Sequence, residues 1–486
     1  MGFYQITEQM IGQAFTEKGD KAFLSTGSAC LDFFSLVGGM RNNIKDSLKL
    51  FMKSYYENPL ITIKLLFYVR DIRGGLGERS IFRYILNSLA NMYPNVAKQL
   101  IEYIPQYGRY DDLLVCLKTP IKKEVINYIK DQLEKDIEAK NNNKPISLLA
   151  KWLPSINTSS DEARELANIL AEGLSMSKEK YRKTLSFLRK GLIIENNIRE
   201  KDFTFDYETV PGGAMFKYRN IFYNDDDERF NKYLEDVSSG KRKMNTKQLF
   251  PYEIIRKFEN DDFMEEEQEE ILDIMWKNFD RTNITSKTIV VRDGSGSMYD
   301  ENPVTANSIA TSLAILFAEQ LTGEFKDTFI TFSAKPRIIK IKGDTIAEKY
   351  WFIERFSDVS TTNISSVYQL ILDVYKHKDF KVEDALERIV IISDMEFDEI
   401  RSERVSTYEY FKNEFDKLGY KIPEVVFWNV NARHIHFPVT NIENVKLISG
   451  ASPKIIEMIT ESKAIVPYDL MLECLEKYSC FDTIKF

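Results

Sequence analysis

Three small oxygen-bearing side chains occupy alternate positions in the stretch TIVVRDGSGSMYD, residues 288–300. Asp293, Ser295 and Ser297 are separated by single glycines and follow a run of residues typical of a buried strand. Oxygen ligands at this spacing suit a hard divalent cation such as Mg²⁺. The same residues also suit a nucleophilic serine or an ordinary polar turn, so the stretch alone leaves three interpretations open.

Two further oxygen-bearing groups are expected near these three. The run RIVIISD ends on Asp394, just as TIVVRD ends on Asp293, and both runs predict parallel strands. Ligands of an open α/β sheet bind outside the carboxyl ends of its strands, so the topology places both carboxylates at one edge. Thr362 lies between them, in a loop that enters a helix. We therefore expect a partial oxygen shell for Mg²⁺ or another divalent cation. The alternative is a hydrogen-bonded turn without a metal. The expected ligands are Asp293, Ser295, Ser297, Thr362 and Asp394.

Catalytic interpretations have less support. A nucleophilic serine needs a base, and the chain has three histidines, His377, His434 and His436. His434 and His436 alternate and could ligate a metal, but no third ligand stands near them, which favours two partly exposed loop residues. Neither a Walker loop nor an HExxH motif occurs. We expect a protein that is not an enzyme, with a metal-dependent hydrolase as the remote alternative.

Two kinds of periodicity divide the chain. Residues 1–258 show the spacing of amphipathic helices, as in the stripe Phe82, Ile85, Leu86 and Leu89, and predict an α-helical domain built of stacked helices. Residues 259–284 read as an acidic helical linker with a solvated face. Strands then alternate with helices over 285–486, which predicts a doubly wound α/β domain.

Two basic clusters stand out in the helical half. Residues 1–258 carry 40 Lys and Arg against 33 Asp and Glu, whereas residues 259–486 carry 26 against 41. Arginine forks bind phosphate oxygens, and a basic helix face can follow a nucleic-acid backbone. The alternative for each cluster is a solvated face or ion pairs to neighbouring acids such as Asp71, Glu78 and Glu179. The candidate phosphate-binding residues are Arg70, Arg73, Arg79 and Arg83, and then Arg182, Lys183, Arg189 and Lys190.

The bulk composition is that of a globular protein, with 43% hydrophobic and 29% charged residues in a chain of 486. The N-terminus lacks the basic start and apolar core of a signal peptide. The longest apolar runs are too short to span a bilayer. Four scattered cysteines without a CxxC pair are typical of a reducing compartment. We expect a cytoplasmic protein with no membrane partner.

The stretch DGSGSM resembles the metal-ion-dependent adhesion site of von Willebrand factor A domains. In that family a threonine in a loop and an aspartate after a later strand complete the site, and Thr362 and Asp394 match them. The resemblance implies direct hydroxyl ligands and a shell that a partner's carboxylate can complete. Two residues depart from the pattern. Arg292 stands where an apolar residue is common and could compete for Asp293 or hold an anionic ligand, and Asn363 stands where an acid is common.

The helical half is similar to the TROVE module of Ro-type ribonucleoproteins, in the stretches NPLITIKLLFYVRDIRGGLGERSIFRYIL, YIPQYGRYDDLL and LLAKWLPSINTSS. The stretches VPGGAMFKYRN, FNKYLEDV and SDMEFD extend the likeness to a poorly characterised Ro-related family of plants, bacteria and large viruses. The resemblance implies a HEAT-like helical ring joined to a von Willebrand factor A domain, with small non-coding or misfolded RNA as partner. The expected function is a non-enzymatic scaffold that binds small structured or single-stranded RNA through the helical domain, with a Mg²⁺-dependent adhesion site in the C-terminal domain. The alternative is a protein-interaction module that recognises a partner's carboxylate through the metal.

Overall fold

The computed structural model describes residues 13–15, 21–260, 264–281, 283–299, 305–357, 363–377, 380–397 and 407–486. These residues form two compact units. Unit 1 contains residues 1–68, 74–76 and 249–479, and unit 2 contains residues 69–73, 77–248 and 480–486. The chain therefore crosses between the two units more than once, and residues 480–486 belong to unit 2.

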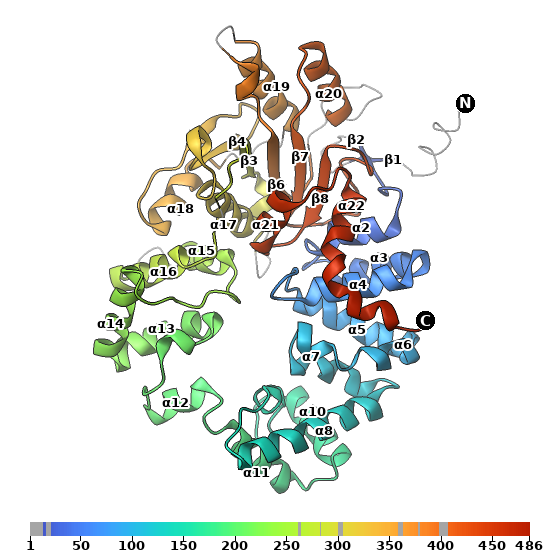
Figure 1. Ribbon diagram of the computed structural model, residues 1–486, viewed down its shortest axis with the longest axis vertical. Helices are drawn as coiled ribbons and strands as arrows, with labels where there is room; N and C mark the ends of the chain where they lie inside the picture. Colours follow the sequence, from blue (N-terminus) through green and yellow to red (C-terminus); the bar gives the residue numbers. More distant parts are fainter. Residues whose placement is uncertain are drawn as a thin grey trace. The chain divides into compact units, whose positions relative to one another are not determined.

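Unit 1 is built on a six-stranded sheet with the strand order β5-β4-β3-β6-β7-β8 (Figure 1). All neighbouring strands are parallel except β5, which is antiparallel to β4. The mostly parallel sheet expected from the strand–helix alternation is confirmed. Its strands are β3 (Thr288–Asp293), β4 (Thr328–Phe332), β5 (Ile338–Lys340), β6 (Arg388–Ser393), β7 (Glu424–Asn429) and β8 (Val445–Ser449).

The two faces of the sheet bury different side chains of each strand, because successive residues of a strand point to opposite faces. Ile289 and Val291 of β3 belong to a core that also contains residues of α19 (Ile364–Tyr375) and α20 (Thr407–Lys417). Arg292 faces the other way, towards α17 (Ala306–Ala318), and contacts Thr311 of that helix. The alternation thus directs Arg292 and Asp293 to opposite faces.

The described residues before position 69 belong to unit 1, which the predicted linear division at residue 258 does not anticipate. Gly38 and Gly39 end helix α2 (Ala29–Val37) against the sheet: the Gly38 N–H donates to Ser449 Oγ at 2.9 Å, and Ala432 N–H donates to the Gly39 carbonyl at 2.8 Å. A Cβ on Gly38 would lie 2.4 Å from the Ser449 carbonyl oxygen. The glycine pair lets the backbone approach the ends of β7 and β8 closely.

The remaining elements of unit 1 surround this core. The predicted acidic linker is two helices, and α16 buries Ile271, Leu272 and Met275 within unit 1 while its glutamates face solvent. The sequence pattern of residues 259–280 predicts one acidic helix, but residues 264 and 265 are not helical and α16 begins at Glu266, so that prediction is wrong. The remaining helices and strands of unit 1 are β1 (Gln13–Phe15), β2 (Lys21–Phe23), α3 (Ile44–Glu57), α4 (Pro59–Arg70), α15 (Pro251–Asn260), α16 (Glu266–Lys277), η3 (Gly296–Tyr299), η4 (Gly323–Phe325), α18 (Ile346–Glu354), η5 (Val382–Asp384), α21 (Lys454–Glu461), α22 (Pro467–Leu475) and η6 (Glu476–Thr483). Helices α4 and η6 each extend into unit 2.

Unit 2 is helical throughout its described residues, as the amphipathic spacing predicts. Phe82, Ile85, Leu86 and Leu89 are all buried on one face of α5. The Ser160 side chain caps α10 by accepting from Ala163 N–H. Within the described part of the chain, no helix is long and apolar enough to cross a membrane. The helices of unit 2 are α5 (Arg79–Met92), α6 (Pro94–Leu100), α7 (Ile104–Tyr107), η1 (Tyr110–Lys118), α8 (Lys122–Asn141), α9 (Leu149–Trp152), α10 (Asp161–Gly173), α11 (Lys178–Arg189), α12 (Ile194–Glu200), η2 (Tyr207–Thr209), α13 (Gly212–Asp225) and α14 (Asp227–Ser238).

Candidate functional site

The two carboxylates predicted to share a sheet edge lie at the ends of neighbouring strands. β3 ends on Asp293 and β6 ends on Ser393, with Asp394 following. Arg292 pairs with Ile392, so Asp293 and Ser393 come next in register. Ser393 Oγ donates to Asp293 Oδ2 at 2.6 Å, and Ser295 N–H donates to Asp293 Oδ1 at 2.9 Å. Asp293, Ser295 and Asp394 are all buried.

The serine hydroxyls lie beside this pair of acids. Ser295 Oγ and Ser297 Oγ are 3.0 Å apart and share a hydrogen bond, because η3 turns the chain back on itself after β3. The fifth predicted ligand, Thr362, lies outside the described residues. Its neighbour Asn363 is described, and its side chain caps α19 by accepting from Ser366 N–H at 3.0 Å. Asn363 therefore performs a structural task at the position where an acid is common.

The ionisation of Asp293 is perturbed at this edge. Burial raises the pKa of the Asp293 carboxyl to about 6, and the charge of Asp394 acts in the same direction. A buried carboxyl whose pKa is raised in this way gains from a divalent cation, which stabilises its ionised form. The donor atoms are all oxygens and too few to close a shell, as Mg²⁺ accepts. Asp293, Ser295, Ser297 and Asp394 fit such an ion.

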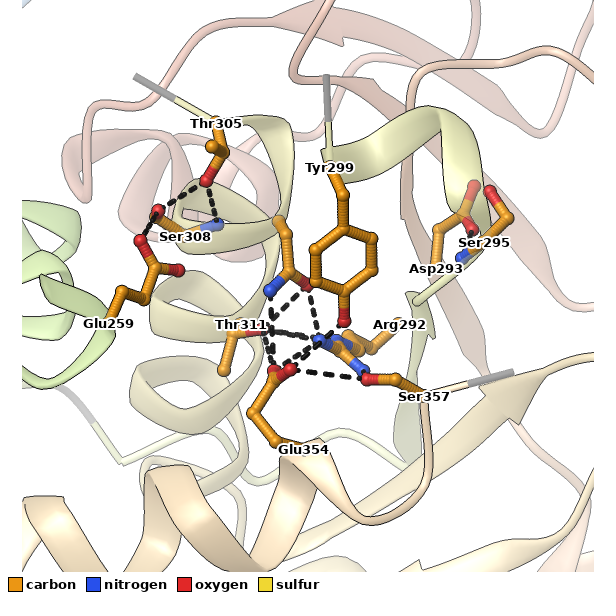
Figure 2. A network of polar contacts seen from close by, with 11 residues as sticks. Glu259, Arg292, Asp293, Ser295, Tyr299, Thr305, Ser308, Thr311, Glu354 and Ser357 are labelled. Atoms are coloured by element: carbon orange, nitrogen blue, oxygen red, sulfur yellow. Dashed lines mark hydrogen bonds and ion pairs between the residues drawn. The ribbon is translucent and has the colours of Figure 1, made fainter. Parts of the chain in front are cut away.

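Arg292 does not compete for Asp293, because it is bound on the opposite face of the sheet. Figure 2 shows its guanidinium between Thr311, Glu354 and Ser357, with Asp293 and Ser295 set apart from this network. Arg292 Nη2 lies 2.7 Å from Glu354 Oε1, and Nη1 donates to Ser357 Oγ at 2.8 Å. Tyr299, in the turn that follows the serines, donates its hydroxyl to Glu354 Oε2 at 2.9 Å.

This buried network ties together the segments around the candidate metal site. Arg292 is 1% exposed, so its charge depends on Glu354 for compensation. Gly294 leaves room for the guanidinium, since a Cβ there would lie 2.7 Å from Arg292 Nη1 and displace it. Neither proposed role of Arg292, competition for Asp293 or capture of an anion, agrees with this placement. The residue joins α17 and α18 instead, through Thr311 and Glu354.

Asp394 has a cationic partner that sequence reasoning missed. Arg433 Nη2 lies 3.0 Å from Asp394 Oδ2. Arg433 follows β7, and its carbonyl accepts from Asn43 Nδ2 at 3.2 Å, so the N-terminal segment helps to hold this loop in place. The stretch ARHIHFP contains Arg433, but nothing in its local pattern indicates a partner 39 residues earlier. A guanidinium at this place lowers the attraction of Asp394 for a metal ion.

Replacement of Arg433 by glutamine is expected to strengthen binding of Mn²⁺, used as a probe for Mg²⁺, by about tenfold, because a unit charge within a few ångströms of the ion is removed. Isothermal titration of the metal-free protein measures this. Arg388→Gln is the matched control, since Arg388 pairs with Glu424 where β6 begins, at the other end of the strand. Unchanged or weaker binding in the Arg433 variant would contradict the assignment.

The histidine pair lies near the same edge but forms a different contact. His436 is buried, and its Nε2 lies 3.6 Å from Glu396 Oε1. The rings of His434 and His436 stack with centroids 6.2 Å apart. Among the residues that the structure describes, no group of three or more His, Cys, Asp and Glu is placed to hold a metal ion. Because His436 is buried, the prediction that both histidines are partly exposed loop residues is wrong for His436.

The first basic cluster divides into buried and exposed members. Arg70 is 1% exposed and its Nε lies 2.7 Å from Asp112 Oδ2. Arg83 bridges Asp112 at 2.5 Å and Asp111 at 2.6 Å. Arg70 cannot reach a phosphate without leaving this network, so its placement is that of a structural residue. Arg73 and Arg79 are exposed, and Arg73 also donates to the Gln106 carbonyl at 2.9 Å.

The second cluster divides in the same way. Arg189 donates to the carbonyls of Ala150 and Leu153 at 2.8 and 2.6 Å, which ties α11 to the segment around α9. Arg182, Lys183 and Lys190 are exposed. Lys183 pairs with Glu179 at 2.7 Å, but both side chains are about two-thirds exposed, so this pair is weak.

The described residues combine a helix-rich part with a mostly parallel α/β sheet. The crystal structure of the Deinococcus radiodurans RO (RSR) protein has the same kind of fold, with a TM-score of 0.51 over 90% of this chain and 100% of that one. The two sequences are 12% identical, so the likeness concerns the fold alone. It supports the Ro-like architecture expected from the motifs.

The family follows from sequence matches. The chain belongs to the family described as Domain of unknown function (DUF2828), whose model matches residues 16–125 and 121–282. A second model, Domain of unknown function (DUF7788), matches residues 287–473. The chain is also 30% identical to Uncharacterized protein L728 of Acanthamoeba polyphaga mimivirus, over 96% of this chain and 88% of that protein.

Proposed function

We propose that this protein is a non-enzymatic RNA-binding scaffold whose helical unit contacts RNA phosphates. The observation that carries the proposal is the Ro-like fold across 90% of the chain. The resemblance to Ro-type ribonucleoproteins implies a HEAT-like helical ring and a small non-coding or misfolded RNA, and we propose both for this chain.

The exposed basic residues of unit 2 supply the proposed contacts. Arg73, Arg79, Arg182, Lys183 and Lys190 face solvent, whereas Arg70, Arg83 and Arg189 are engaged by acids or carbonyls within the unit. Exposed arginine and lysine side chains can bind phosphate at little cost, because they make few contacts with the rest of the protein. The proposed RNA surface therefore comprises the five exposed residues.

Charge reversal of the five exposed residues to glutamate is expected to weaken RNA binding at least tenfold and to flatten its salt dependence, since fewer counterions are released. Fluorescence anisotropy with a labelled small structured RNA, over a series of salt concentrations, measures both. The control reverses five exposed lysines of unit 1, namely Lys326, Lys340, Lys342, Lys421 and Lys463. Equal losses in the two variants, or no RNA binding by the unchanged protein, would overturn the proposal.

A second function rests on the oxygen ligands of unit 1. We propose that Asp293, Ser295, Ser297, Thr362 and Asp394 hold Mg²⁺ or another divalent cation, and that a partner's carboxylate completes the shell. The hydrogen-bonded cluster around Asp293 supports this proposal. Unlike a nucleophilic serine, a metal site needs no base next to Ser295 and Ser297. The two functions use different units, so both can operate in one protein.

A further inference from the structure

One face of α11 carries an exposed aromatic ring in the middle of a lysine stripe. Phe187 is 44% exposed, although phenylalanine is normally among the most buried residue types. Of the phenylalanines that the structure describes, Phe486 at the chain end is the other one so exposed. Tyr181, Leu185 and Leu188 already form the buried face of the helix, so Phe187 is not needed there.

The residues around Phe187 are basic. With 100° of rotation for each residue, Lys180, Lys183 and Phe187 fall within roughly 60° of one another on the helix surface. Lys190 follows as the C-terminal cap, and its carbonyl accepts from Lys140 Nζ at 2.6 Å, which brings a further lysine to this end. Over residues 178–190, six Lys and Arg stand against one acid, Glu179.

An exposed ring flanked by lysines fits one kind of ligand. A base that is not paired in a duplex stacks on an aromatic face, while its flanking phosphates meet the positive charges. A duplex offers the phosphates but keeps its bases stacked on one another. An acidic protein segment would satisfy the lysines but would not require a flat ring at their centre.

We propose that Phe187, with Lys180, Lys183 and Lys190, is a stacking platform for an unpaired base of RNA bound along α11. This inference rests on the proposed RNA-binding function and deepens it, since it separates a single-stranded segment from a duplex. The Lys183–Glu179 ion pair is exposed at both partners, and an approaching phosphate can replace Glu179 at small cost.

The test uses the full chain and two probes, a single-stranded oligouridylate of about ten nucleotides and an RNA duplex of equal length. Phe187→Leu is expected to weaken binding of the oligouridylate about tenfold and to leave duplex binding unchanged, because only the single strand offers a free base face. Phe187→Trp is expected to bind as the unchanged protein does. Its added tryptophan fluorescence should be quenched when the oligouridylate binds.

The control is Trp351→Leu, which removes a ring that is 42% exposed on α18 of unit 1. This variant is expected to bind both probes normally. If Phe187→Leu binds the oligouridylate as well as the unchanged protein does, or if both probes weaken equally, the platform is wrong while RNA binding stands. If the unchanged protein binds neither probe, or binds an acidic peptide instead, the proposed function fails and the platform with it.

Discussion

Asp112→Ala is expected to destabilise unit 2 by about 3–5 kcal/mol, because it leaves a buried guanidinium without its counter-charge. Asp112 is fully buried and pairs with both Arg70 and Arg83. It also accepts from Arg109 N–H at 2.9 Å, which fixes the start of η1. One carboxylate thus connects α4, α5 and η1, so its removal affects three elements together.

Gly108 shows how tightly this network is built. A Cβ at Gly108 would lie 2.4 Å from Asp112 Oδ2 and 2.9 Å from Arg70 Nε. No larger residue fits there unless the ion pair moves. The stretch QYGRYDD therefore combines the acid with the glycine that makes room for it.

Urea unfolding, followed by circular dichroism and by hydrogen exchange of the amides in α4, α5 and η1, measures the Asp112 effect. Glu165→Ala is the matched control. Glu165 pairs with Lys118 at the same 2.7 Å, but both side chains are more than half exposed, so a loss of about 0–1 kcal/mol is expected. Similar losses in the two variants would show that burial does not decide the strength of the Asp112 network.

Asp293→Asn is expected to weaken binding of Mn²⁺, as a probe for Mg²⁺, by about 100-fold or more, because a full negative charge next to the ion is lost. The same change should stabilise the metal-free protein. The pKa of Asp293 is raised by burial and by Asp394, so its ionised form is disfavoured in the folded state. Asparagine keeps the shape of the side chain without the charge.

The gain in stability depends on pH in a defined direction. A carboxyl whose pKa is raised by folding destabilises the protein as pH rises from about 4 to above 6. At pH 7 the metal-free asparagine variant is therefore expected to be more stable by roughly 1–3 kcal/mol, and the difference should vanish near pH 4. Thermal unfolding with a chelator present, at both pH values, measures this.

Asp384→Asn serves as the control for Asp293, since Asp384 is an exposed acid of η5 and its loss changes the net charge equally. This variant should bind Mn²⁺ normally and show no pH-dependent gain. If Asp293→Asn retains metal binding, the oxygen cluster is a hydrogen-bonded turn. If it loses metal binding without a gain in stability, the electrostatic account of Asp293 is wrong.

Much of the sheet could be predicted from the sequence because its signals are local. Near-continuous Ile and Val runs ending on Asp293 and at Ser393–Asp394 predict parallel strands, and parallel strands present their carboxyl ends at one edge. The antiparallel pair β4–β5 also follows from two short strands around a turn. The helix stripe that includes Phe82 and Leu86 is buried as its spacing predicts.

The basic clusters show where local patterns stop being sufficient. Arg70 and Arg73 stand three residues apart in one glycine-containing segment, yet Arg70 is buried and Arg73 is exposed. The difference depends on Asp112, which is 42 residues from Arg70 in sequence and in contact with it in the fold. Exposure, and with it the capacity to bind a phosphate, is a property of the packed unit.

The sequence by itself determined the alternating strands and helices of the sheet and the edge at which Asp293 and Asp394 meet, because periodicity and strand direction are local properties. It did not indicate the short pair β1–β2 within the half predicted as helical. Only the tertiary structure decided that Arg292 turns to Glu354, that Arg433 contacts Asp394, and that Gly38 and Gly39 lie against the ends of β7 and β8. Each of these contacts joins residues tens to hundreds of positions apart. The packing of the folded chain determines which partner lies next to a buried charge, and no short sequence pattern specifies that partner.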